Sequence, residues 1–156
     1  MNWYNGYNPR ERSAMDRAPY PPSARQPPCA MCGDPQPIQM QTHAEDYSTP
    51  YRWEPPSTYP VCRRCHSRLH SRFISPANWG SFLNFLRRGY YAREVSSVDL
   101  GRLARLGDGY TWPVLTHEPP VRPGKSAFWW ESLTLDVASR ESASFRAMRE
   151  HGRSEA

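Results

Sequence analysis

The 156-residue chain has few of the residues from which a compact core is built. Only 38% of its residues are hydrophobic, whereas 17 are prolines. Twelve of those prolines lie before residue 61, so the shortage of core-forming residues falls mainly on the first part of the chain. A core this small usually depends on a disulfide or a metal ion. At this length we expect one domain with tails rather than two domains.

The sequence also contains no hydrophobic run long enough to cross a bilayer, and no apolar segment follows Met1. A membrane-spanning helix needs about 20 largely apolar residues, and a secretory signal needs a shorter apolar run near the start. We therefore expect a soluble, cytoplasmic protein that has no membrane partner.

Cysteines are few, and their positions argue against disulfides. The four lie in two C-x2-C pairs, Cys29 with Cys32 and Cys62 with Cys65. In a reducing compartment this spacing indicates metal binding. Each pair forms a tight turn that directs two thiolates at one ion, and tetrahedral Zn2+ takes four such ligands. We predict a structural zinc site that supplies folding free energy. Reduced, unligated cysteines are the alternative, and they would leave this proline-rich segment with little to fold around.

Acidic residues are absent between Val61 and Arg93, whereas seven arginines lie there. The whole chain has a formal net charge of +5 and a sequence pI near 9.2. A basic block of this kind suits a polyanion because phosphates offset the repulsion between the arginines. A solvated basic face is the alternative. We predict a nucleic-acid interface, with DNA as the expected partner. Its expected residues are Arg63, Arg64, Arg68, Arg72, Arg87 and Arg88.

The pattern of residues divides the chain into three parts. Residues 1–27 have no helical or strand period, so we expect a disordered Pro-, Tyr- and Arg-rich arm that a protein partner could order. Residues 28–106 are expected to form the zinc module with packed helices, and residues 107–156 an extension of undefined structure. Within that extension, FWWESLTLDV at 128–137 is expected to hold a strand or the start of a helix.

Inside the zinc module the pattern predicts one strand and a helix. Alternating apolar and polar residues predict a short strand at 38–42, and the proline-interrupted segment 51–60 is expected to be a loop. The segment 62–71 lacks helix breakers. As a helix it would place His66 and His70 on one face, because residues four apart are neighbours on a helix surface.

The best-marked helix follows the zinc module. Ser75 can be its N-cap, Pro76 its first residue and Gly89 its C-terminal stop. Its apolar residues recur at helical spacing and are expected to form core: Trp79, Phe82, Leu83 and Leu86. A further short helix is expected within 96–107. The side chains expected to face inward from it are Val98, Leu103 and Leu106.

The cysteine and histidine pattern resembles a known family. A C-x2-C pair, a histidine in THAEDYSTP and then C-x2-C-H-x3-H are similar to HNH endonucleases that carry a four-cysteine zinc, and to their small relatives from phages and mobile elements. THAEDYSTP resembles the HHxDYxxP element of the short HNH-like proteins. The resemblance covers about Cys29–Phe73. It implies an α+β protein: a small zinc-stabilised ββα-metal (HNH-like) module, in which a β-hairpin and a helix surround one catalytic ion, followed by short helices.

The resemblance also implies roles for individual residues. His43 takes the place of the general base that would draw a proton from a water aimed at a phosphate. His66 and His70 take the helix positions that bind a second divalent ion, Mg2+, Mn2+, Ni2+ or Zn2+, which would stabilise charge on that phosphate. Thr42 stands where the family has an Asp or His ligand, and no residue matches the Asn of the HNH pattern. The arginines placed to hold the backbone are Arg63, Arg64, Arg68 and Arg72.

Three functions from different classes follow from these features. The first is an HNH-like metal-dependent DNA endonuclease, with His43, His66 and His70 as its catalytic residues. The second is a catalytically inactive DNA-binding or regulatory module on the same fold. The third is a zinc-scaffolded adaptor that binds a protein partner through the N-terminal arm and Trp129–Trp130. For the histidines themselves, the alternatives are a bond from His66 to the zinc turn and an exposed helix position for His70.

Overall fold

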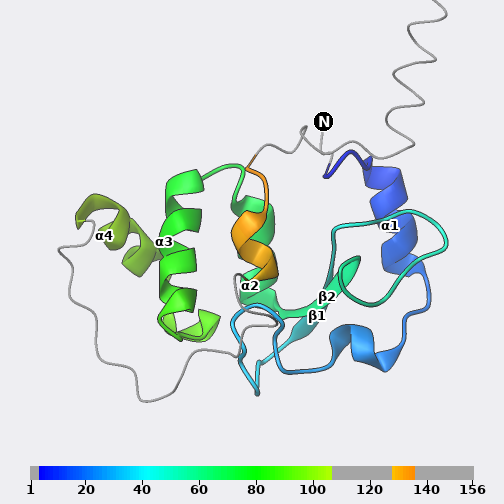
Figure 1. Ribbon diagram of the computed structural model, residues 1–156, viewed down its shortest axis with the longest axis horizontal. Coiled ribbons are helices and arrows are strands. Elements are labelled where there is room, and N and C mark those ends of the chain that lie inside the picture. Colours follow the sequence, from blue (N-terminus) through cyan, green and yellow to red (C-terminus); the bar gives the residue numbers. More distant parts are fainter. Residues whose placement is uncertain (1–3, 107–127, 136–156) are drawn as a thin grey trace, which may run out of the picture.

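The fold was analysed in a computed structural model, which describes residues 4–106 and 128–135. Over these residues the protein is α+β, with a two-stranded sheet and four α-helices (Figure 1). The α-helices are α1 (Pro9–Arg17), α2 (Arg63–Ser71), α3 (Pro76–Arg87) and α4 (Ser97–Leu106). The strands are β1 (Met40–Ala44) and β2 (Thr58–Cys62). The described residues also contain three short 3-10 helices: η1 (Pro22–Arg25), η2 (Ala92–Glu94) and η4 (Trp129–Ser132).

The two strands form an antiparallel pair in which Met40 lies opposite Cys62 and His43 lies opposite Tyr59. The residue pattern did not place strand β2, because Pro60 and the prolines before it made 51–60 resemble a loop; only the family resemblance implied a hairpin. Strand β1 begins two residues later than the predicted strand at 38–42. The reason is that β2 ends at Cys62, so pairing with it begins opposite, at Met40.

Helices α2 and α3 confirm the predicted helical segments. Helix α2 starts directly after the last residue of β2. Helix α3 begins at Pro76, and Gly89 adopts φ 93° just beyond its end, a conformation that glycine tolerates best. Ser75 precedes α3 but makes no side-chain capping hydrogen bond. The four predicted apolar residues of α3 are all buried in the main core, together with the four cysteines and Leu69.

Helix α4 also forms, but its inward face was predicted wrongly. Val98 is 62% exposed, whereas Leu100 is completely buried. Which face of α4 turns inward is set at its start. Ser96 and Asp99 exchange hydrogen bonds there and so fix the first turn. The side chains of Leu103 and Leu106, which were also expected to face inward, lie outside the described residues.

The expectation of a disordered arm at 1–27 is wrong for residues 4–27. Asn8 accepts a hydrogen bond from the backbone of Glu11, and the Glu11 carboxylate accepts one from the backbone of Asn8, so α1 begins with a complete capping box. Met15 of α1 is 2% exposed and packs with three other buried side chains. This second core cluster consists of Tyr4, Met15, Ala44 and Tyr47. Figure 1 shows α1 on the side of the sheet away from α3 and α4.

The predicted extension at 107–156 is described only at residues 128–135. There the expected strand or helix start is a 3-10 turn, η4, and it belongs to the main core. Phe128 and Trp130 are buried, and the ring of Trp129 stacks on Tyr59 with centroids 3.8 Å apart. Of the two tryptophans that the adaptor alternative assigned to a partner, Trp130 is therefore buried in the core and Trp129 is partly buried against it. Of the helices in the described ranges, not one has the length and apolar character needed to cross a membrane.

The ordered arm can be tested by removing its buried side chain. Met15→Ala is expected to lower the free energy of unfolding by about 2–4 kcal/mol, because it removes buried methylenes and leaves a cavity between α1 and β1. Ser13→Ala, at an exposed position of the same helix, is the control and should change it by less than about 0.5 kcal/mol. Urea unfolding followed by circular dichroism measures both. Equal stabilities of Met15→Ala and wild type would show that the arm does not pack.

Candidate metal centres

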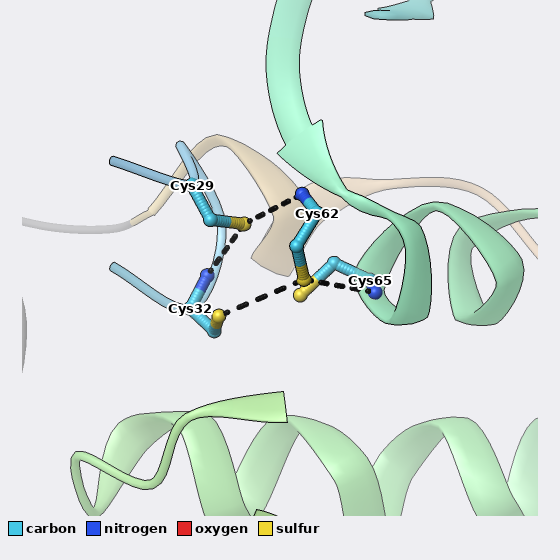
Figure 2. Close-up of side chains that lie close together, drawn as sticks. All are labelled: Cys29, Cys32, Cys62 and Cys65. Atoms are coloured by element: carbon cyan, nitrogen blue, oxygen red, sulfur yellow. Dashed lines mark hydrogen bonds between the residues drawn. The ribbon is translucent and has the colours of Figure 1, made fainter. Parts of the chain in front are cut away.

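The four cysteines come together at the junction between β2 and α2 (Figure 2). Cys29 and Cys32 lie in the turn that precedes β1, Cys62 ends β2, and Cys65 lies in the first turn of α2. Their four sulfur atoms lie within 4.8 Å of one another, and all four side chains are buried. Gly33 adopts φ 80° where the first turn closes, as a tight turn requires. As predicted, this group could hold a metal ion such as zinc.

Backbone N–H groups surround the sulfur atoms. The Cys29 sulfur accepts from Cys32 N at 3.4 Å and from Cys62 N at 3.2 Å, and the Cys62 sulfur accepts from Cys65 N at 3.4 Å. Hydrogen bonds from neighbouring thiols hold the pKa of Cys29 well below its usual value, whereas burial raises the pKa of Cys65. Four thiols so close together cannot all ionise without a cation, and a bound Zn2+ would supply that charge.

A second cluster joins β1 to α2. It consists of His43 from β1 and of His66 and His70 from α2. The two helical histidines lie one turn apart on one face of α2, as predicted. Each contributes a ring nitrogen, and these nitrogens lie within 4.8 Å of one another. The Nε2 atoms of His66 and His70 are 3.0 Å apart. Three imidazole nitrogens this close together could hold a transition-metal ion.

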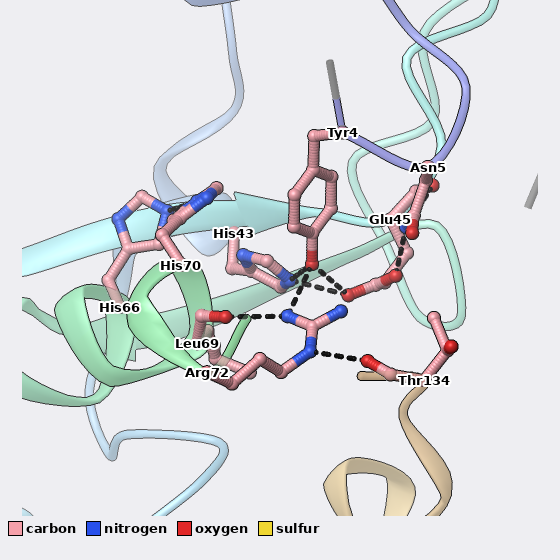
Figure 3. A network of polar contacts seen from close by, with 9 residues as sticks. All are labelled: Tyr4, Asn5, His43, Glu45, His66, Leu69, His70, Arg72 and Thr134. Carbon is pink, nitrogen blue, oxygen red and sulfur yellow. Dashed lines mark hydrogen bonds and ion pairs between the residues drawn. The ribbon is translucent and has the colours of Figure 1, made fainter. Parts of the chain in front are cut away.

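Two polar side chains contact ring nitrogens of this cluster: Glu45, which Figure 3 shows beside His43, and Gln41. The Nε2 atom of His43 lies 2.6 Å from Glu45 Oε1, and since the carboxylate can only accept, the imidazole donates. The Nδ1 atom of His66 lies 2.7 Å from Gln41 Oε1. The buried Nδ1 of His43 has no hydrogen-bond partner among the described residues. A carboxylate or carbonyl on the far nitrogen is the usual arrangement for a metal-binding histidine.

The environment keeps the three histidines neutral. Burial lowers the pKa of His66 to about 4 and that of His70 to about 3, and the neighbouring Arg12 charge adds to both shifts. Burial also lowers the pKa of His43, although the Glu45 carboxylate opposes this. Glu45 itself has a pKa lowered to about 2, since its bonds to His43, Tyr4 and Asn5 outweigh its burial. A neutral imidazole is the form that binds a metal ion.

The buried Arg72 corrects one of the predictions. Its side chain is 1% exposed, so it cannot hold a phosphate as expected. Its Nη1 donates to the Tyr4 hydroxyl at 2.9 Å and to the Leu69 carbonyl at 2.6 Å, and its Nε donates to the Thr134 carbonyl at 2.9 Å. The Tyr4 hydroxyl in turn donates to Glu45 at 2.7 Å. Arg72 is therefore a structural residue that links the arm, α2 and the C-terminal segment.

The other predicted arginines do not gather around the histidines. Arg68 donates to Ser97 Oγ at 3.1 Å, and Arg64 donates to the Arg93 carbonyl at 3.4 Å, so both are directed towards the η2–α4 region. Arg87 pairs with Glu131 at 3.2 Å at the far end of α3. Arg63, Arg64, Arg87 and Arg88 are exposed. This distribution forms scattered basic surface and not a single interface at the histidine cluster.

Two arginines that were not predicted do lie beside the histidines. Arg12 of α1 and Arg25 of η1 line a pocket of about 100 Å³ together with His66 and His70. Sequence reasoning missed them because they belong to the arm, which was expected to be disordered. One signal was present: Asn8-Pro9-Arg10-Glu11 has the residue order of a capping box with proline at the first helical position.

Comparison with known proteins provides no relative: the chain matches no family model, no curated protein and no solved structure. The function must therefore be inferred from the geometry of the two clusters.

The four-cysteine site leads to a prediction about folding. The zinc ion of the four cysteines is expected to survive dialysis in wild-type protein and to be lost from the variant Cys65→Ser. Because the cysteines lie in the main core, loss of the ion should also reduce helical circular dichroism and expose the core to dye. Ser67→Ala, an exposed change in the same helix, is the control and should keep both the ion and the signal. A fully folded Cys65→Ser protein without zinc would contradict the prediction.

Proposed function

We propose that this protein is an HNH-like, metal-dependent nuclease that hydrolyses phosphodiester bonds of DNA at the cluster of His43, His66 and His70. The observation that carries the proposal is the meeting of three neutral imidazoles from β1 and α2, whose nitrogens lie within 4.8 Å of one another. A purely structural role for the three neutral histidines would leave the unpartnered Nδ1 of the buried His43 without explanation.

The arrangement of elements supports this assignment. A hairpin of β1 and β2 is followed at once by α2, which is the order of a ββα-metal module. The hairpin supplies one histidine and the helix supplies two. The four-cysteine cluster lies at the point where β2 passes into α2, so it fixes the helix that carries His66 and His70.

The geometry favours a changed role for His43. The resemblance places it as the general base, but its side chain is 0% exposed and its Nε2 is bonded to Glu45. We assign it instead as the third metal ligand, held in place by Glu45. This assignment also accounts for Thr42, which stands at the usual ligand position. The Thr42 hydroxyl donates to the Ala24 carbonyl at 2.9 Å, and three imidazoles make a ligand from Thr42 unnecessary.

The residues around the cluster fit hydrolysis of a phosphodiester. A divalent ion bound by the three histidines would polarise a phosphate oxygen and make a water molecule more acidic. Glu45 and Gln41 hold two of the rings in the orientation that leaves a nitrogen free for the ion. Arg12 and Arg25 line the adjoining pocket and offer planar donors to phosphate oxygens.

One observation favours the second candidate, an inactive DNA-binding module. Several exposed arginines lie on α2 and α3 away from the histidines, and such surface charge can hold DNA without cutting it. The protein-adaptor function has less support, because Tyr4 and Met15 of the arm, and Trp130, are buried within the chain.

The proposal predicts cleavage that depends on the histidines. Labelled single- and double-stranded DNA is incubated with protein and added Mg2+, Mn2+, Ni2+ or Zn2+, and products are resolved on a denaturing gel. His66→Ala and His70→Ala are each expected to reduce the rate at least about 100-fold, because each removes a ligand of the ion. Both variants should retain the zinc of the four cysteines.

Ser67→Ala, which changes an exposed residue between the two histidines, is the matched control and should cleave like wild type. Equal rates for His66→Ala and wild type would mean that the activity belongs to a contaminant. Binding of DNA without cleavage under any of the four metals would favour the inactive binding module.

A further inference from the structure

We propose that the pocket beside the histidines binds single-stranded nucleic acid in preference to duplex, with Arg12 and Arg25 holding a phosphate and Tyr20 stacking on a base. The inference rests on the proposed function, because it names the substrate class of the same site. It concerns residues from the N-terminal arm, which lie outside the segment that resembles the HNH family.

Five separate segments form the pocket. Its lining residues come from α1, from the stretch that leads into η1, from η1 itself, from β1 and the loop after it, and from α2. Its volume is about 100 Å³, which accommodates a phosphate with part of its sugar but not a base pair. His66 and His70 form part of its wall, and His43 is completely buried behind them. A scissile phosphate must therefore enter this pocket to approach the three ring nitrogens.

The charges in the pocket favour a phosphate. Two arginines line it, and Asp16 is the one acidic residue among its lining side chains. Burial raises the pKa of Tyr47 to about 12, so its hydroxyl stays protonated and adds no negative charge. Two guanidinium groups opposite one carboxylate leave a net positive pocket even before an ion is bound.

An aromatic rim adjoins these charges. Tyr20 is 41% exposed, and its ring lies 6.0 Å from that of Trp53, measured between centroids. The Arg25 guanidinium lies 4.1 Å from the Tyr20 ring centroid, and Arg25 Nε is 3.4 Å from Thr42 Oγ1, next to His43 in β1. Arg25 thus connects the exposed Tyr20 ring to β1, the strand that carries the buried His43.

This arrangement distinguishes a single strand from a duplex. In a single strand the base next to the phosphate can turn out and stack on an exposed ring, while the phosphate enters the pocket. In a duplex each base is stacked and paired inside the helix, so no base is available to Tyr20. The basic pocket lined by Arg64 and Arg68 lacks this second feature, because the ring that lines it, Phe82, is buried.

The test measures binding and does not require cleavage. A fluorescein-labelled 12-nucleotide DNA strand and the same strand in a 12-base-pair duplex are titrated with protein, without added divalent metal, and anisotropy gives Kd. The single strand is expected to bind more than threefold more tightly than the duplex. Tyr20→Leu and Arg25→Gln should each weaken single-strand binding about fivefold or more. Both side chains are exposed, and circular dichroism checks that the variants fold.

Arg64→Gln is the matched control, since it removes one exposed arginine that lies away from the pocket. It should weaken binding less than either pocket variant. A preference of threefold or less for the single strand, no binding of either probe, or pocket variants that lose no more affinity than Arg64→Gln would overturn the inference. These outcomes differ from failure of the proposed function, in which the single strand binds in the pocket but no metal supports its cleavage.

Discussion

The four cysteine sulfurs, gathered within 4.8 Å of one another, are the constraint on which the other elements depend. They tie the turn before β1 to the end of β2 and to the first turn of α2. Because Cys62 ends the strand and Cys65 lies in the helix that follows, the site fixes the angle at which α2 leaves the sheet. That angle brings His66 and His70 to His43. The apolar side chains of α3 belong to the same core as the four cysteines, so the cysteine cluster is part of the main core.

A buried polar network between the N-terminal arm, β1 and α2 supports the histidine cluster. Tyr4 from the arm contacts Glu45 and Arg72, and Glu45 holds His43 and also accepts from the Asn5 side chain. Arg72 and Glu45 both hydrogen-bond to the Tyr4 hydroxyl, so a positive and a negative charge share this buried region. The arm is consequently part of the site: it braces the histidine of β1, and its α1 and η1 supply the arginines of the adjoining pocket.

The sequence predicted the features whose signals are local. C-x2-C and H-x3-H spacing placed the cysteines and the two helical histidines, and the apolar stripe of α3 identified its buried face. Contacts between distant residues were not predictable in this way. Arg72 seemed to belong to a basic surface, but it is buried by Tyr4 and Thr134, which lie 68 and 62 residues away. Helix α1 buries only Met15, so its sequence has no apolar repeat that would predict a helix. Strand β2 contains Pro60, which made its sequence resemble a loop.

The central proposal is that the three histidines bind a second ion, separate from a zinc ion bound by the four cysteines. The most direct measurement counts metal ions per chain by plasma emission spectrometry, on protein prepared with excess zinc and then dialysed. We predict two ions in wild type, and one in the double variant His66→Ala/His70→Ala and in His43→Ala. One ion in the wild type and in both variants would contradict the claim and leave the histidines as a buried polar group without a metal of their own.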